Sequence, residues 1–94
     1  MHAVVVVTTV DEAGTDPEFK TLREQIVPAV RQLPGFVSGY WLAPVGGIAT
    51  AAVLFDSEDV ARKAAEGMGV KPGASLAPGT EITSVEYVEV AAHA

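Results

Sequence analysis

Four consecutive valines, Val4 to Val7, constrain this chain more than any other stretch. They lie within a run of mostly β-branched residues from His2 to Val10, a composition that favours a strand. Successive side chains of a strand point to opposite faces, so a run of valines places apolar groups on both faces. The sequence therefore predicts a strand over residues 2–10, in a sheet that is covered on both sides.

The segment after this strand changes to a helical period. Apolar residues recur at steps of three and four: Phe19, Leu22, Ile26, Val30 and Leu33. Thr15 or Asp16 is expected to cap the start of this helix. Pro28 removes one backbone hydrogen bond inside the helix, so we expect a kink there. Pro34-Gly35 is expected to end the helix.

Three further elements follow along the chain. Residues 36–55, FVSGYWLA and IATAAVLF around the turn APVGG, predict an antiparallel hairpin. DSEDVARKAAEGMG then predicts a short helix capped by Asp56 or Ser57. Residues 69–79 are rich in Gly and Pro and predict a surface loop long enough to be a candidate lid. ITSVEYVEV, residues 82–90, predicts the last strand.

The order β-α-β-β-α-β predicts a ferredoxin-like α+β fold, a four-stranded antiparallel sheet with two helices on one face. A chain of 94 residues is expected to form a single domain, residues 1–94, with an ordered core over 1–90 and a loose tail over 91–94. Both helices lie on one face, so the apolar strands leave the other face bare. A homodimer with two sheets packed face to face would cover it.

This arrangement resembles the dimeric α/β-barrel superfamily, and within it the antibiotic-biosynthesis-monooxygenase-like (ABM-like) proteins. The resemblance covers nearly the whole chain, and its motifs are Leu33-Pro34-Gly35-Phe36, Leu54-Phe55-Asp56-Ser57-Glu58-Asp59 and Val85-Glu86-Tyr87-Val88-Glu89-Val90. The family includes cofactor-independent oxygenases, haem-degrading enzymes and isomerases. The resemblance therefore implies a dimeric barrel with a pocket between the sheet and its helices.

Two departures from the family pattern bear on the cofactor. Members often carry a tryptophan at the end of the third strand and a histidine about nine residues later, where this chain has Phe55 and Ala64. Haem-degrading members use an asparagine, and this sequence contains none. Ala64 can neither ligate iron nor hydrogen-bond to it. The resemblance thus predicts no haem, and we expect neither a cofactor nor a metal.

Tyr40 and Trp41 are neighbours on one predicted strand, so their rings must lie on opposite faces, one toward the helices and one toward the dimer interface. The sequence does not decide which. If Leu42 pairs with Ile48, Trp41 lies opposite Ala49, over which an indole can lie flat. On this register Trp41 shares its face with the residues at the end of the third strand.

The pocket candidates follow from this face. The small residues of the second helix either let it close tightly on the sheet or leave an apolar space beneath it. The candidates are Ser38, Trp41, Phe55, Ala64, Met68 and Tyr87, with Arg23 and Glu86 as further polar groups near them. The two histidines, His2 and His93, lie at the chain ends and are not expected to act as a base or ligand. No catalytic residue is predicted.

Composition excludes several partners. The net charge of -6 would repel the phosphates of nucleic acids and anionic membranes. No apolar run approaches the roughly 20 residues that span a bilayer. The absence of cysteine is compatible with a reducing cytosol, so a cytoplasmic location is expected.

Two functions stay open from the sequence. The first is a small-molecule-binding protein with an apolar pocket, which as an enzyme would be a cofactor-independent monooxygenase acting on an aromatic or polyketide-like substrate. Such an enzyme would supply desolvation, orientation and one or two hydrogen bonds. The alternative is a non-catalytic ligand-sensing or assembly module of the same fold, which the plain set of side chains favours.

Overall fold

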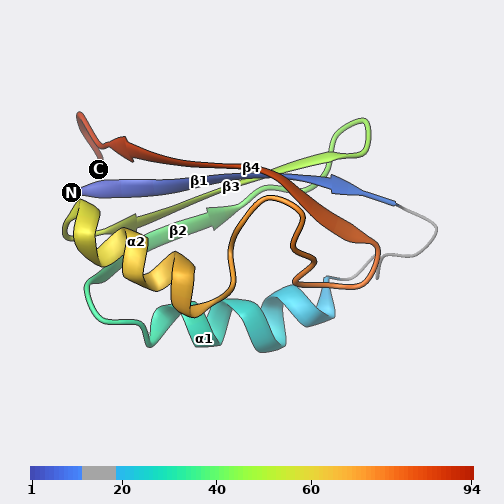
Figure 1. Ribbon diagram of the computed structural model, residues 1–94, viewed down its shortest axis with the longest axis horizontal. Helices are drawn as coiled ribbons and strands as arrows, with labels where there is room; N and C mark the ends of the chain where they lie inside the picture. Colours follow the sequence, from blue (N-terminus) through green and yellow to red (C-terminus); the bar gives the residue numbers. More distant parts are fainter. Residues whose placement is uncertain (12–18) are drawn as a thin grey trace.

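The computed structural model describes residues 1–11 and 19–94. Its elements are β1 (His2–Val10), the π-helical segment η1 (Leu22–Ile26), α1 (Val27–Arg31), β2 (Phe36–Trp41), β3 (Ile48–Phe55), α2 (Glu58–Gly67) and β4 (Thr80–Glu89). The strands form one antiparallel sheet in the order β2-β3-β1-β4. Figure 1 shows both helices on the same side of this sheet. The predicted ferredoxin-like α+β fold is confirmed.

The valine run forms the centre of the sheet, because β1 pairs with β3 on one side and β4 on the other. Val4 lies on the face that meets the helices and is 4% exposed. Val5 and Val7 lie on the opposite face, which no helix covers, and they are half-buried there by neighbouring strands. The two faces of the same strand therefore differ in what covers them.

The β2–β3 hairpin turns at Gly46 and Gly47, which have φ angles of 60° and 77° and so suit glycine. Two backbone hydrogen bonds, 2.9 and 3.1 Å, join Val45 to Ile48 across this turn. Trp41 pairs with Ala51. The predicted register, with Trp41 opposite Ala49, is therefore wrong by two residues.

The error has a local cause. The prediction assigned five residues to the loop, whereas the turn itself uses only two. Between Val45 and Leu42 the pairing with β3 shifts by one residue. The Leu42 N–H then donates to the Thr50 carbonyl over 2.9 Å. Pro44, which has no N–H to donate to a ladder, lies in this irregular part. A shift of two residues leaves every side chain on its predicted face.

The first helix is irregular where the sequence has proline. The Val27 N–H donates to the carbonyl of Leu22, five residues earlier, which makes the turn before Pro28 π-helical. Pro28 then lies in the first turn of α1, where its missing N–H costs little. The sequence predicted a kink at Pro28. The irregularity that the structure shows is a π-helical turn just before this proline. The predicted caps, Thr15 and Asp16, lie outside the described residues.

The second helix is regular and well capped. The Ser57 hydroxyl accepts a hydrogen bond from the Val60 N–H at 3.3 Å. Of the two predicted candidates, Asp56 and Ser57, the N-cap is therefore Ser57. Gly35, with a φ angle of 75°, lies so close to α2 that an added Cβ would be 2.5 Å from Val60 Cγ1. Among the helices of the described residues, none is long and apolar enough to cross a membrane.

Candidate functional site

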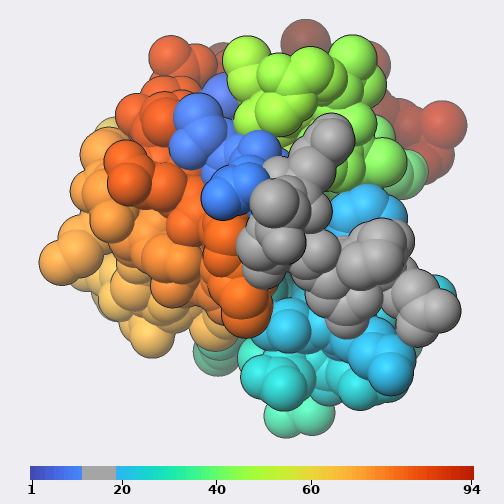
Figure 2. Space-filling view, turned by 90° about the vertical axis from the view of Figure 1, so that its right-hand side faces the viewer, coloured from blue at the N-terminus to red at the C-terminus, as the bar shows by residue number. Residues whose placement is uncertain are grey.

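An apolar cavity of about 190 Å³ lies between the helix-facing side of the sheet and the two helices. Val4, Val6, Thr8, Trp41, Val53 and Phe55 are among the residues of its floor. The η1–α1 segment, α2 and the loop before β4 form its other walls. Figure 2 shows the end of the molecule where the hairpin, the start of η1 and the loop before β4 meet.

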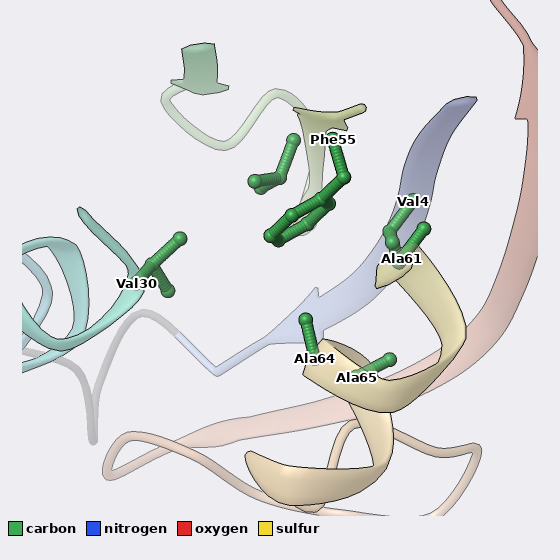
Figure 3. Packing of buried hydrophobic residues seen from close by; sticks show 7 residues of the cluster. Val4, Val30, Phe55, Ala61, Ala64 and Ala65 are labelled. Carbon is green, nitrogen blue, oxygen red and sulfur yellow. The ribbon is translucent and has the colours of Figure 1, made fainter. Parts of the chain in front are cut away.

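The two helices approach the cavity differently. Ala61 of α2 is completely buried and packs in one cluster with Val4 of β1. Figure 3 shows Val30 of α1 on the other side of Phe55, directed toward its ring. Ala64 lies one turn further along α2 and lines the cavity. The sequence left open whether these alanines close the helix on the sheet or leave a space. The structure shows a tight contact at Ala61 and a space beside Ala64.

The structure also decides the orientation of the aromatic pair. Trp41 faces the helices, and Tyr40 lies on the open face, 61% exposed. The indole folds back over Gly39, where an added Cβ would lie 2.8 Å from the Trp41 Cη2. It therefore rests on a glycine of its own strand rather than on Ala49 of the neighbouring strand. Any side chain at position 39 would displace it.

Four of the six pocket candidates line the cavity: Trp41, Phe55, Ala64 and Met68. Ser38 and Tyr87 are not among the lining residues. Ser38 alternates with Gly39 and so shares the open face with Tyr40. Tyr87 is on the helix side, but its ring is covered by the Arg62 guanidinium, 4.3 Å from the ring centroid. The further polar candidates, Arg23 and Glu86, are exposed and do not line the cavity either.

Sequence reasoning missed most of the cavity wall. It singled out no residue of β1, although Thr8 shares the face of Val4 by simple alternation. It also did not use the helical stripe, although Leu22 and Ile26 of that stripe line the cavity. Strand alternation and helical spacing are sufficient to identify these positions as cavity-lining once the inward face is known. The loop at 69–79 contributes further lining residues: Val70, Leu76, Ala77 and Pro78.

The cavity is poor in polar groups, and none of the lining residues within 1–11 and 19–94 carries a charge. The threonines Thr8, Thr21 and Thr80 supply hydroxyl groups near it. Thr80 already donates to the Ala77 carbonyl at 2.7 Å. Within residues 1–11 and 19–94, the Thr8 hydroxyl has no hydrogen-bond partner. No group of His, Asp and Glu in that part of the chain is arranged to hold a metal ion.

His2 takes part in a separate cluster outside the cavity. Its Nε2 lies 3.4 Å from Oε1 of Glu58, whose Oε2 lies 3.3 Å from Nε of Arg62. The Nδ1 of His2 is buried and has no hydrogen-bond partner among the described residues. The cluster joins the start of β1 to the first turn of α2. His93 lies in the exposed C-terminal segment.

The fold and the cavity together define a ferredoxin-like α+β protein with an apolar space between sheet and helices. No family model and no curated protein matches the chain. Among solved structures it is similar to MhuD, in a variant with serine in place of an arginine and two manganese protoporphyrin IX molecules bound per active site. The TM-score is 0.68 at 22% identity, over 100% of this chain and 98% of that one. At that identity the likeness shows the fold, and the predicted resemblance is confirmed at this level.

Proposed function

We propose that this protein binds a small apolar molecule in the cavity between the sheet and α1. The observation that carries the proposal is the cavity itself, about 190 Å³ and lined almost wholly by carbon. Protein interiors are close-packed and contain few voids larger than a water molecule. An apolar cavity of about 150 Å³ stays dry and binds benzene. A natural cavity of this kind is therefore best explained by a ligand.

The open face of the sheet supports a homodimer as the functional form. Large apolar side chains on or beside this face are well exposed: Tyr40 61%, Leu42 59%, Ile48 53% and Val88 44%. Apolar side chains that are exposed on one face of a sheet favour an interface with a second protein. A second copy of the sheet would bury it and complete the cover that the valine run requires. The absence of cysteine supports a cytoplasmic location.

Native mass spectrometry of the purified protein tests both parts of the proposal in one spectrum. We expect a dimer that carries the added mass of a small molecule. The Ala64→Leu variant, which places extra carbon atoms in the cavity, should keep the dimer and lose that mass. If the purified protein carries no ligand and binds no member of an apolar fragment library, the proposed binding function is contradicted. A monomer would contradict the dimer.

A cofactor-independent monooxygenase is the second candidate function. The observation that favours it is the unpartnered Thr8 hydroxyl, which can hold a substrate oxygen in a water-poor site. In the balanced reaction, an activated methylene becomes a carbonyl, one atom of O₂ enters the product and the other leaves as water. Among the described residues, the cavity lining contains no His, Asp or Glu to act as a base, so a neutral substrate must lose its activated C–H proton to water.

Oxygen consumption separates the two candidates. 2-Indanone, a two-ring ketone whose ring methylene is activated in this way, is the appropriate substrate for a cavity of this size. Turnover with labelled oxygen in the product would establish the enzyme, and Thr8→Val should then lower the rate. Binding of ligands without any oxygen uptake would leave the protein as a non-catalytic binding module. In that case, a change of oligomeric state on ligand addition would indicate a sensor.

A further inference from the structure

The size of the cavity limits its ligand. At the packing density of protein interiors, about 0.75, a cavity of this size holds a molecule of roughly 140 Å³, on the order of ten non-hydrogen atoms. This corresponds to one or two fused rings. Pockets for larger organic ligands enclose about 300–1,000 Å³. A porphyrin is several times larger than this volume, so most of it would lie outside the cavity.

The charge of the cavity limits the ligand further. In the part of the chain that the structure describes, all lining residues are apolar or threonine, so none of them can neutralise a carboxylate. Burying an ionised group without a partner is costly, so an anion is excluded from the deep part of the cavity. Porphyrin propionates would therefore find no cation among the lining residues.

Thr8 carries a hydroxyl on the cavity floor that is free to bind. Thr8 lies on the cavity side of β1, and the register of β1 with β4 shifts between Val7 and Thr8. A β-bulge of this kind bends the strand and re-aims its side chains, and bulges often occur beside functional sites. The shift leaves Thr83 bonded to the Val7 carbonyl at 3.1 Å, while the Thr8 hydroxyl has no partner among the described residues.

We infer that the cavity accepts a neutral molecule of one or two rings whose single hydroxyl or carbonyl oxygen meets Thr8, and that it excludes carboxylates and porphyrins. This inference rests on the proposed binding function and names its ligand class. Trp41 and Phe55 provide aromatic surface for the rings, and Thr8 fixes their orientation. The similarity of fold to a porphyrin-bound protein thus does not make this cavity a porphyrin site, because its volume is small and its described lining residues are uncharged.

Three molecules of one shape test the inference: naphthalene, 1-naphthol and 1-naphthoate, with manganese protoporphyrin IX as a fourth probe. Binding to the wild-type protein at pH 7 is measured by calorimetry. We expect 1-naphthol to bind about 3- to 10-fold more tightly than naphthalene through one hydrogen bond. The naphthoate anion should bind on the order of 100-fold more weakly than 1-naphthol. Thr8→Val, which keeps the shape of the side chain, should make naphthol and naphthalene equal.

The outcomes distinguish failure of the ligand class from failure of the binding function. Tight binding of naphthoate or the porphyrin, abolished by Ala64→Leu, would overturn the inference while the binding function stands. A naphthol preference that survives Thr8→Val would overturn the role of Thr8. If no probe and no library fragment binds the wild-type protein, both the inference and the proposed function fail. Circular dichroism of each variant confirms that it is folded.

Discussion

The two helices cover the same face of the sheet in different ways. In α2, three alanines on one side are buried, and Ala61 has no exposed surface at all. In η1 and α1 together, only Val30 is buried, and the helix changes from π to α geometry at Val27. One helix is thus regular and tightly docked, whereas the other is irregular and stands over the cavity.

The contrast follows from the side chains that each helix turns inward. Alanine lets a helix backbone approach the sheet, so α2 leaves little room beneath its first turn. Leu22, Ile26 and Val30 are longer, and they hold their helix further from β-strands that themselves carry small residues such as Ala51. The space between the roof residues of this helix and the floor residues of the sheet is the cavity. An apolar pocket therefore needs no dedicated residue, only a mismatch of side-chain sizes across one interface.

The largest expected effect lies at the tight contact. Ala61→Leu adds three carbon atoms where none fits, and we expect a loss of about 2–3 kcal/mol in the free energy of unfolding, measured by urea denaturation. Ala64→Leu is the matched control, one turn along the same helix but at the cavity wall. It should cost less than about 1 kcal/mol. Equal losses at the two positions would show that no space exists beside Ala64.

The cap of α2 gives the next effect. Ser57→Ala removes the acceptor for the Val60 N–H, and we expect a loss of about 1 kcal/mol in thermal or urea unfolding. Ser75→Ala removes a hydroxyl that donates to the Ala77 carbonyl in the exposed loop, and should change stability by less than about 0.5 kcal/mol. A larger loss at Ser75 would mean that the loop, not the helix, sets the stability of this region.

The irregular helix offers a test of ligand binding rather than of stability. Pro28→Ala restores an N–H, so the turn before it can become α-helical. Each residue of an α-helix turns by about 100°, so removal of the π turn would rotate Leu22 off the cavity wall. We expect stability within about 1 kcal/mol of wild type but clearly weaker binding of 1-naphthol. Pro34→Ala, outside the π turn, is the control, and unchanged binding in both variants would refute the role of the turn.

The smallest expected effect concerns the contact between α2 and β4. Arg62→Gln removes both the ion pair with Glu58 and the cation that covers the Tyr87 ring, and we expect a loss of about 0.5 kcal/mol. Lys63→Gln, on the exposed side of the same helix, controls for charge. In a Tyr87→Leu background the effect of Arg62→Gln should shrink, and an undiminished loss would assign the whole effect to Glu58.

Predictability differed between the parts of the fold for a physical reason. The bounds of β1 and β3, the cap at Ser57 and the glycine turn depend on residues close together in sequence, and the sequence predicted them. The pairing of Trp41 was wrong because the prediction assigned five residues to the loop, whereas the turn uses only two. The π turn was not predicted because the sequence signals only the missing N–H of Pro28, which is compatible with several local geometries.

The candidate site was predictable only in part. Trp41, Phe55, Ala64 and Met68 were named before the structure and line the cavity, whereas Ser38 and Tyr87 were named for their polar groups and lie elsewhere. Thr8 was overlooked because a threonine inside a valine run is also an ordinary strand residue. Its place on the cavity floor, with a hydroxyl that has no partner among the described residues, is visible only in the tertiary structure.

The sequence by itself determined the order of the elements, the period of each one and thus which side chains share a face. These properties are local, because alternation and helical spacing depend only on neighbours along the chain. Tertiary structure decided that Trp41 rather than Tyr40 faces the helices, and that the roof stands far enough from the floor to leave a cavity. Both depend on the packed volumes of segments distant in sequence, which no single segment encodes.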